Sequence, residues 1–361
     1  MTQMGPLVSV CVPTYNYARF LPDCIESVLQ QTFADWELVI TDDCSDDGTP
    51  ELVRRYAQAE PRIHYIINER RLGMHGNLQR ATESGRGRYL KILCADDWLA
   101  PGCLGAMFRH MEGHPQVVLG TCAEIHTDEA GTPLRQQFFF RKPLSVIAGP
   151  AMLDRMALGN GFGGNSSLFI RASTFREIGG FDLTLLYAGD LDLCARLCRL
   201  GNYLHTDEPL FYGRTQAASS SSVNPKKLWD VIDYFVIPEK LFRPRKLMNP
   251  EWRRYYTNVM LTTARYLVNV PVRYLHGDKE YARNLLKVIW QHGNVPLGLL
   301  YAPIQAFSRI YNCVTARPSY GNWLPPEPGM GTPSHWREPR FLNASDGLRD
   351  NSGSLQTTAL P

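Results

Sequence analysis

The segment VSVCV (residues 8–12) is the first of five short apolar runs in the first third of the chain. The others are ELVIT (37–41), IHYII (63–67), YLKILC (89–94) and VVLGT (117–121). Between the runs lie stretches with apolar residues at helical spacing, and the first of these opens with Pro22 and Asp23. Strands that alternate with helices of this length predict an α/β fold, a doubly wound and mostly parallel sheet with helices on both faces.

Two pairs of aspartates follow predicted strands directly. Asp42-Asp43 comes after residues 37–41, and Asp96-Asp97 comes after residues 89–94. Ligands of open α/β sheets bind beyond the carboxyl ends of the strands, so both pairs are candidate site residues. One such pair alone could start a turn or cap a helix. Two pairs at equivalent strand ends indicate a shared site more strongly.

A third acidic position opens a predicted helix at about 189–200. Asp190 and Asp192 are two residues apart, so they cannot lie on one helix face. A carboxylate at a helix N-terminus can also serve as a cap. If Asp190 is the exposed member of the pair, Asp192 is the structural one.

The rest of the chain divides by composition. Residues 126–223 read as mixed structure, with a hairpin around Gly131, and Ser219–Ser222 marks a boundary. Residues 224–317 show helical spacing, whereas 318–361 are rich in Pro, Gly, Ser and Asn without any period and are predicted to be disordered. We therefore expect a domain at 1–223, a helical region at 224–317 and a disordered tail.

Charge and cysteine content narrow the functional class. The 361 residues carry a net charge of +3, too balanced for nucleic-acid binding through bulk charge. Residues 224–317 nevertheless hold 15 Lys and Arg against six Asp and Glu. The nine cysteines lack zinc-site spacing, which favours buried, reduced thiols. No basic region precedes the short apolar run before Pro13, so we do not expect a signal peptide. We expect a cytoplasmic location instead.

Five segments in order resemble glycosyltransferase family 2, the inverting enzymes with a GT-A fold, over about residues 7–216. They are VSVCVPTYN (8–16), QTFADWELVITDDCSDDGT (31–49), ADDWLAP (95–101), GGFD (179–182) and GDLDLCARL (189–197). The resemblance makes residues 1–223 a nucleotide-sugar-binding catalytic domain.

The resemblance also implies roles for single residues. Asp190 would be the general base, Asp97 the metal ligand and Asp96 a neighbour of the ribose, while Asp43 would accept a hydrogen bond from a uracil-type base. Donor contacts are implied for Pro13, Thr14, Asn16, Arg71, Asn77 and Arg214, and His75 lies in the same stretch as Arg71 and Asn77. Hard carboxylate oxygens suit Mg²⁺ or Mn²⁺ that bridges a diphosphate.

This set of residues is chemically consistent. Cleavage of the sugar–diphosphate bond places negative charge on the leaving group, and a divalent cation stabilises that charge. One carboxylate base on the opposite side activates the acceptor hydroxyl, giving inversion in a single displacement. One departure is Tyr212-Gly-Arg214-Thr-Gln216, where family members often have Arg-x-His, because glutamine cannot carry a charge.

The sequence is compatible with three functions. The leading one is inverting transfer from a nucleotide-diphosphate sugar, with a UDP-sugar favoured, to a saccharide or lipid-linked acceptor in bacterial surface polysaccharide or glycolipid synthesis. A sugar-nucleotide nucleotidyltransferase would need a glycine-rich first loop in place of Pro13-Thr-Tyr-Asn16. A catalytically silent nucleotide-binding scaffold is expected to lack the base or the metal pair.

Two further signals remain. Residues 159–164 fit G-x-G-x-x-G but do not follow a strand into a helix, so a flexible acceptor-side loop is the better interpretation. Basic and aromatic residues at 243–256 suit either a packed helical cap or a peripheral contact with a membrane surface. The apolar stretch 295–307 is too short and too broken by proline to span a membrane.

Overall fold

The computed structural model describes residues 5–138, 140, 142–158, 162–216, 228–242, 250–293, 295–296, 298–299, 302–303 and 322–324. Its main strand order is β11-β7-β6-β9-β4-β1-β2-β3, and β10 pairs with β5, β6 and β8. The strands are β1 (Val8–Thr14), β2 (Trp36–Asp42), β3 (Ile63–Ile67), β4 (Tyr89–Ile92), β5 (Trp98–Leu99), β6 (Val117–Thr127), β7 (Pro133–Phe138), β8 (Leu144–Ile147), β9 (Phe169–Arg171), β10 (Asn202–Arg214) and β11 (Asn322–Leu324). All five predicted strands are present.

The half of the sheet nearest the N-terminus is parallel. β3, β2, β1 and β4 pair in parallel, and β6 pairs in parallel with β10. β9 lies antiparallel between β4 and β6. β6 and β7 form the predicted hairpin, because the five residues 128–132 are too few for the crossover that a parallel partner requires. The α/β class is confirmed, and the sheet is mixed beyond β4.

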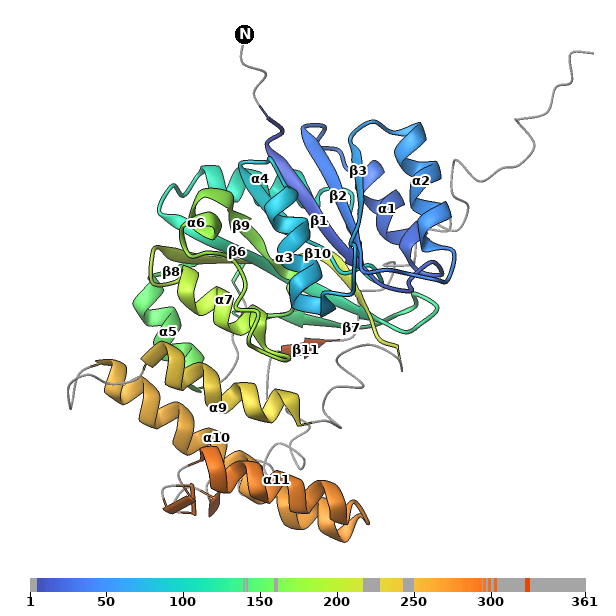
Figure 1. Cartoon of the computed structure of the whole chain (residues 1–361). Coiled ribbons are helices and arrows are strands. Elements are labelled where there is room, and N and C mark those ends of the chain that lie inside the picture. The colour runs from blue at the N-terminus through green and yellow to red at the C-terminus, as the bar shows by residue number, and fades with distance from the viewer. Residues whose placement is uncertain are drawn as a thin grey trace, which may run out of the picture.

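Helices cover both faces of the sheet (Figure 1). They are α1 (Leu21–Leu29), α2 (Thr49–Ala59), α3 (Gly73–Ser84), α4 (Cys103–Glu112), α5 (Gly149–Leu158), α6 (Ala172–Glu177) and α7 (Gly189–Leu197). Alternate residues of β1 explain the two layers, because Val10 packs in a core with α1, α2 and α4, whereas Cys11 packs in a second core with α3, α5, α6 and α7. Six of the eight described cysteines are buried and all eight are free thiols.

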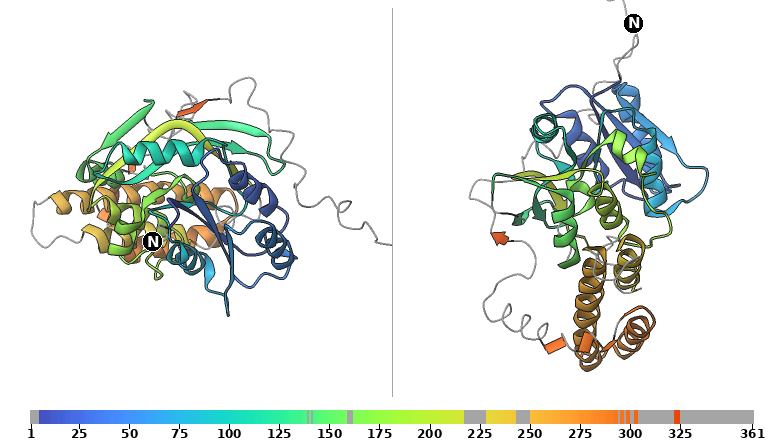
Figure 2. Two further views of the ribbon diagram at one scale, coloured as in Figure 1. Left: turned by 90° about the horizontal axis from the view of Figure 1, so that it is seen from above. Right: turned by 90° about the vertical axis from the view of Figure 1, so that its left-hand side faces the viewer.

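Three helices form the predicted helical region: α9 (Trp229–Phe242), α10 (Pro250–Leu275) and α11 (Lys279–His292). They stack at one end of the molecule, on the side remote from the N-terminus (Figures 1 and 2). α9 contributes Ile237 to the core of α7 and Phe235 to a third core with α10 and α11. Among the described residues, none of the helices combines the length and apolar composition that crossing a membrane requires.

Two predictions are affected by the limits of the described residues. The Ser219–Ser222 boundary and most of 318–361 lie outside them. Within that tail, the described residues 322–324 form β11, which pairs antiparallel with β7. The pairing supplies hydrogen bonds to an edge strand whose outer side would otherwise be open.

Candidate active site

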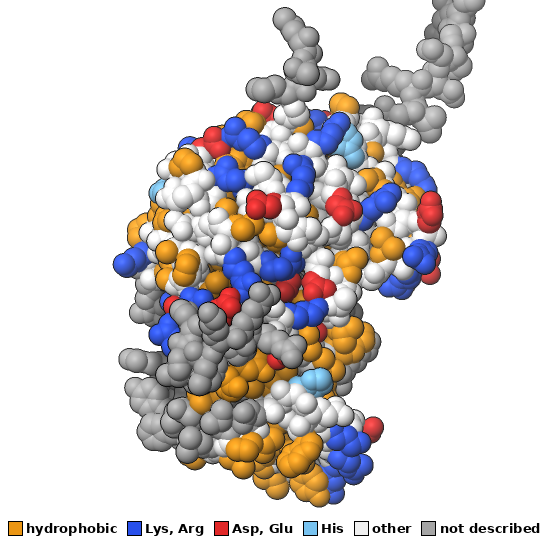
Figure 3. Space-filling view, turned by 60° about the vertical axis from the view of Figure 1, so that its left-hand side comes forward, with side chains coloured by type: hydrophobic (Ala, Val, Ile, Leu, Met, Phe, Trp, Pro, Cys, Tyr) orange, Lys and Arg blue, Asp and Glu red, His pale blue; other side chains and the backbone are white. Residues whose placement is uncertain are grey.

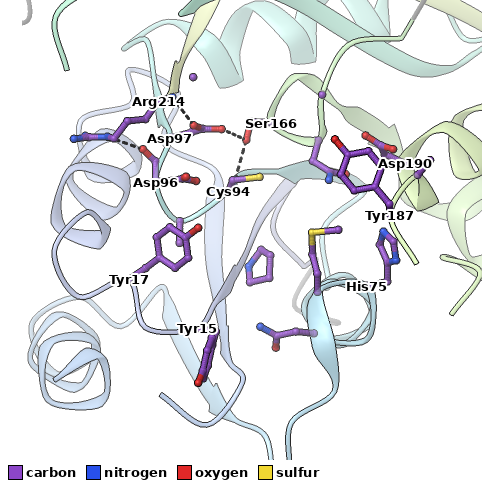
Figure 4. Close-up of a pocket in the computed structure, with 18 of the residues that line it drawn as sticks. Tyr15, Tyr17, His75, Cys94, Asp96, Asp97, Ser166, Tyr187, Asp190 and Arg214 are labelled. Carbon is purple, nitrogen blue, oxygen red and sulfur yellow. Dashed lines mark hydrogen bonds between the residues drawn. The ribbon is translucent and has the colours of Figure 1, made fainter. Parts of the chain in front are cut away.

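One pocket of about 1260 Å³ lies where β1, β2 and β4 end. Every residue to which the family resemblance gives a role lines it: Pro13, Thr14, Asn16, Asp43, Arg71, Asn77, Asp96, Asp97, Asp190 and Arg214. Asp42, the other candidate of the first pair, does not line the pocket; it is buried and accepts hydrogen bonds from Ser45 and Tyr65. Figure 4 shows Asp96, Asp97 and Arg214 on one side, Asp190, Tyr187 and His75 on the other, and Cys94 and Ser166 between them. Segments far apart in the sequence therefore converge on one cavity.

The loop after β1 is tied to the loop after β2. Asn16 adopts a left-handed backbone conformation with φ 56°, which asparagine tolerates better than most residues. Its amide Nδ2 donates to Asp46 Oδ1 at 2.8 Å, and Asp46 N–H donates back to Asn16 Oδ1 at 2.9 Å. Asn16 therefore fixes the shape of the pocket wall with its side chain.

Asp43 is buried at the end of β2 and organises the start of α3. Its Oδ1 accepts hydrogen bonds from the Leu72 N–H at 2.7 Å and Asn68 Nδ2 at 3.0 Å, and its Oδ2 accepts one from the Gly73 N–H at 2.9 Å. Oδ2 keeps one acceptor position on the pocket side, 3.8 Å from Arg71 Nε. The guanidinium of Arg71 lies 3.4 Å from the ring centre of Tyr15.

Asn77 has a role that the sequence does not reveal. Its Nδ2 donates to the carbonyls of Thr14 and Thr41, at 3.1 and 3.0 Å, and its Oδ1 accepts from Asn68 at 2.8 Å. The amide group is therefore occupied inside the protein. Asn77 holds the ends of β1 and β2 together while it lines the pocket, and its contact with the donor stays a prediction.

The carboxylates after β4 are held by residues from distant segments. Asp97 accepts hydrogen bonds from Ser166 Oγ at 2.6 Å and the Arg214 N–H at 2.9 Å. Asp96 accepts one from Gln216 Nε2 at 2.7 Å. Gln216, which stands where the family resemblance leads one to expect histidine, therefore binds the acidic pair as a neutral donor.

Arg214 is engaged within the protein as well. Its side chain is only 5% exposed, and its guanidinium donates to Asp23, the Asp96 carbonyl and the Glu129 carbonyl. It also packs between the rings of Phe20 and Trp98. These contacts tie the Asp96 carbonyl to α1 and to the loop after β6, whereas the sequence predicts a contact of Arg214 with the donor diphosphate.

The donor set beside Asp97 fits a divalent cation. Ligand atoms of Cys94, Asp96 and Asp97 lie within 4.8 Å of one another. Burial raises the pKa of Asp96, and burial followed by the charge of Asp96 raises the pKa of Asp97 well above the usual range. Two oxygen ligands suit Mg²⁺ or Mn²⁺, and a bound cation would relieve the repulsion between the carboxylates.

Glu124 of β6 is a pocket residue that sequence reasoning missed. Burial raises the pKa of its carboxyl to about 7, and Arg135 lowers it in part. Its Oε2 lies 3.4 Å from His126 Nε2. Nothing in the pattern of β6 distinguishes it, because alternate residues of a strand near a pocket mouth are often polar.

Asp190 lies at the first turn of α7 and faces the pocket. Its Oδ1 accepts a hydrogen bond from the Leu191 N–H at 2.8 Å. Burial raises the pKa of Asp190, and the Leu191 N–H and His75 lower it in part. Asp192 instead is buried and pairs with Arg196 at 2.7 Å, which confirms that it is the structural member.

The chain is similar in sequence to known glycosyltransferases over part of its length. The family model described as Glycosyl transferase family 2 matches residues 9–179. TuaG of Bacillus subtilis, a protein named for teichuronic acid biosynthesis, is 40% identical over 97 residues, which are 27% of this chain and 38% of TuaG. A GalNAc(5)-diNAcBac-PP-undecaprenol beta-1,3-glucosyltransferase of Campylobacter jejuni is 31% identical over 118 residues, or 32% of this chain and 38% of that protein. The chain thus spans well under two thirds of either relative.

Solved structures share the fold over a longer stretch. TarS residues 1–349 of S. aureus, in complex with UDP, align at a TM-score of 0.59 with 14% identity, covering 90% of this chain and 98% of that one. The mannosyltransferase PcManGT of Pyrobaculum calidifontis, in complex with GDP-Man and Mn²⁺, aligns at 0.53 with 19% identity, covering 87% and 85%. The predicted GT-A-like fold is confirmed by these likenesses.

Proposed function

Since residues 9–179 make this chain a member of glycosyl transferase family 2, we propose that it transfers a sugar from a nucleotide-diphosphate donor to an acceptor hydroxyl with inversion. The observation that carries the proposal is the convergence of Asp43, Asp96, Asp97 and Asp190 on one pocket. The pocket is large enough for a nucleotide sugar together with part of an acceptor.

The donor base would lie against the loop after β1. Asp43 Oδ2 retains an acceptor position for the N–H of a uracil-type base, and Tyr15 with the stacked Arg71 offers a flat surface beside it. A UDP-sugar is the favoured donor on this ground. Pro13, Thr14 and Asn16 would shape the wall that the nucleotide meets.

Asp97 would hold the divalent cation, with Asp96 beside it and Cys94 within reach. When bound, Mg²⁺ or Mn²⁺ supplies Lewis-acid stabilisation of the charge on the departing diphosphate. Ser166 and the backbone N–H of Arg214 orient the Asp97 carboxylate, and Gln216 orients that of Asp96.

Asp190 would act as the general base. It lies across the pocket from Asp97 in Figure 4, so an acceptor hydroxyl beside it would approach the sugar opposite the leaving group. A single base and no carboxylate nucleophile give inversion. The raised pKa of Asp190 favours transfer of the proton from a hydroxyl to its carboxylate.

The acceptor would be a saccharide or a lipid-linked saccharide of bacterial surface polysaccharide or glycolipid synthesis, met at the cytosolic face of the membrane. Tyr187, Trp229 and Tyr234 line the Asp190 side of the pocket and offer aromatic faces to a sugar ring. Residues 224–317 would provide a peripheral contact with the membrane.

The two other functions are not favoured. A nucleotidyltransferase is opposed by the glycosyltransferase relatives and by the first loop, and a silent scaffold by the presence of both Asp97 and Asp190 in the pocket. Nothing in the described residues calls for nucleic acid as a partner.

A donor screen tests the proposal. Purified protein with Mg²⁺ or Mn²⁺ is mixed with UDP-, GDP- and dTDP-sugars, and thermal shift is followed by a hydrolysis assay. We expect one UDP-sugar to raise the melting temperature and to be hydrolysed slowly. If none of the donors is bound or turned over, the proposed function is wrong.

A further inference from the structure

Residues 182–190 lead into the first turn of α7 and end at Asp190; we call this segment the base loop. Hydrogen bonds with α9 of the helical region hold it in place. Asp233 of α9 is 2% exposed, and its Oδ2 accepts hydrogen bonds from three consecutive backbone N–H groups, those of Leu186, Tyr187 and Ala188, at 3.0, 2.6 and 2.8 Å. No other side chain of the described residues binds these three N–H groups.

A second contact comes from the same face of α9. Lys240 stands seven residues after Asp233, which is two helical turns. Its Nζ donates to Asp182 Oδ2 at 2.6 Å and to Thr184 Oγ1 at 2.5 Å. Ile237, midway between the two, is fully buried in the core that α7 also joins. One face of α9 therefore holds both ends of the base loop.

α3 holds the base loop from the opposite side. His75 Nδ1 lies 3.1 Å from the Leu185 carbonyl, and because a carbonyl can only accept, Nδ1 carries the proton. Gln79 Oε1 accepts a hydrogen bond from the Phe181 N–H at 2.8 Å. Without α9, the N–H groups at 186–188 would lose the carboxylate that binds all three of them.

We propose that α9 is part of the active site and that Asp233 is a positioning residue that holds Asp190 toward the acceptor. The inference rests on the proposed role of Asp190 as the base, and it extends the catalytic unit past residue 223. A carboxylate bound to three successive N–H groups fixes the backbone just before α7 as a charged cap would.

The charge of Asp233 also reaches Asp190, whose pKa it raises in addition to burial. The other ionisable groups that face Asp190 are His75 of α3, Tyr187 of the base loop, Tyr234 of α9, Cys94 after β4 and Cys194 of α7. Farther along the pocket wall lie Asp230 of α9 and Arg265 of α10. Only Asp233 among these groups combines a negative charge with direct bonds to the base loop.

The test is Asp233→Asn in the full chain, which keeps the shape of the side chain and removes its charge. We expect faster amide hydrogen exchange in peptides covering 183–190, a kcat lower by about 10- to 100-fold, and unchanged UDP affinity and donor KM. The acidic limb of the kcat/KM profile should move to lower pH, because Asp190 loses a neighbour that raises its pKa. Asp233→Glu, which restores the charge, should return the limb toward the wild-type position.

Glu239→Gln is the matched control, since Glu239 lies on the same helix and accepts a hydrogen bond from Tyr255 of α10. It should leave exchange at 183–190 and the pH profile unchanged. If Asp233→Asn does not fold, Lys240→Met replaces it, with faster exchange expected at 182–184. Wild-type exchange rates at 183–190 in Asp233→Asn, or an unmoved acidic limb, would overturn the inference.

Exchange and UDP affinity are measured without turnover. If the wild-type protein binds no donor, the proposed function is wrong. The exchange rates at 183–190 would still show whether Asp233 holds the base loop. Faster exchange with unaltered kcat would keep the contact and reject its role in positioning Asp190.

Discussion

Burial and the surrounding hydrogen-bond donors set the acceptor capacity and the pKa of single carboxylates in this pocket. Asp43, Asp97 and Asp190 are all aspartates at the carboxyl-end edge of the sheet, yet Asp43 is bound by backbone N–H groups and Asp97 by Ser166 and Arg214. Asp190 has one backbone donor and otherwise faces the cavity. The carboxylate of Asp190 is thus left with acceptor capacity toward the cavity, where an acceptor hydroxyl would meet it.

Asp190→Asn should keep nucleotide affinity and lose transfer, because an amide cannot accept the proton. In the wild type, the raised pKa of Asp190 places the acidic limb of kcat/KM above the value near 3.9 of an ordinary aspartate, so activity falls as the pH drops through that raised pKa. A pH–rate profile with calorimetric UDP titration measures both. Asp192→Asn is the control, and an unaltered transfer rate in Asp190→Asn would rule out Asp190 as the base.

Asp97→Asn should abolish metal-dependent turnover and weaken Mn²⁺ binding by at least about tenfold, since a neutral amide replaces the best-placed oxygen ligand. Isothermal titration with Mn²⁺ in the presence of UDP gives the affinity, and circular dichroism reports the fold. Asp278→Asn, at an exposed position before α11 that does not line the pocket, serves as the charge-matched control. Undiminished Mn²⁺ affinity in Asp97→Asn would exclude it as the ligand.

At the level of elements, the pocket exists because loops after parallel strands are tied together by buried polar side chains. Asn77 reaches from α3 to the ends of β1 and β2, and Asp43 reaches from β2 to the start of α3. The hydrogen bonds of Asn77 are buried, so their loss costs more free energy than the loss of hydrogen bonds at the surface.

Asn77→Ala should therefore lower the free energy of unfolding by about 2–4 kcal/mol, since it removes three buried hydrogen bonds, two to strand-end carbonyls and one from the Asn68 amide. Urea unfolding followed by circular dichroism measures the change. The matched variant is Asn284→Ala, at an exposed position of α11, with an effect within about 0.5 kcal/mol. Equal stability of the two variants would show that Asn77 does not hold the strand ends together.

For the whole molecule, the helical region serves two purposes in our proposal. Its inner side completes the pocket, through Trp229, Tyr234 and Arg265. Figure 3 shows hydrophobic side chains exposed near basic ones at the end of the molecule that α10 and α11 form. The large exposed hydrophobic residues of these two helices include Tyr274 (54% exposed), Leu275 (83%), Leu286 (46%) and Trp290 (75%). Exposed Lys279, Arg283 and Lys287 share the face of α11 that carries Leu286 and Trp290.

We place the proposed membrane contact at this end rather than at Arg253 and Arg254, because those two side chains pair with Asp154 of α5. We expect Leu275→Ser with Trp290→Ser to reduce binding to vesicles containing anionic lipid by about tenfold or more, because aromatic and aliphatic anchors are lost. Sedimentation with vesicles measures the binding. Leu200→Ser, an exposed leucine at the end of α7, is the control, and unchanged sedimentation of the double variant would favour a packed cap without a membrane role.

Sequence pattern determined the fold class, the parallel half of the sheet, the family resemblance and the aspartates that line the pocket, because apolar periodicity and the position of aspartates after strands are local properties. Only the tertiary structure decided which of the predicted side chains keep an acceptor toward the cavity and which have their polar groups hydrogen-bonded within the protein, as Asn77 and Arg214 do. It also revealed Glu124, whose carboxyl is buried in the pocket wall, and Asp233, whose three backbone N–H partners lie 45 to 47 residues earlier in the chain. Hydrogen-bond partners and burial are set by the packing of distant segments, and no short stretch of sequence encodes them.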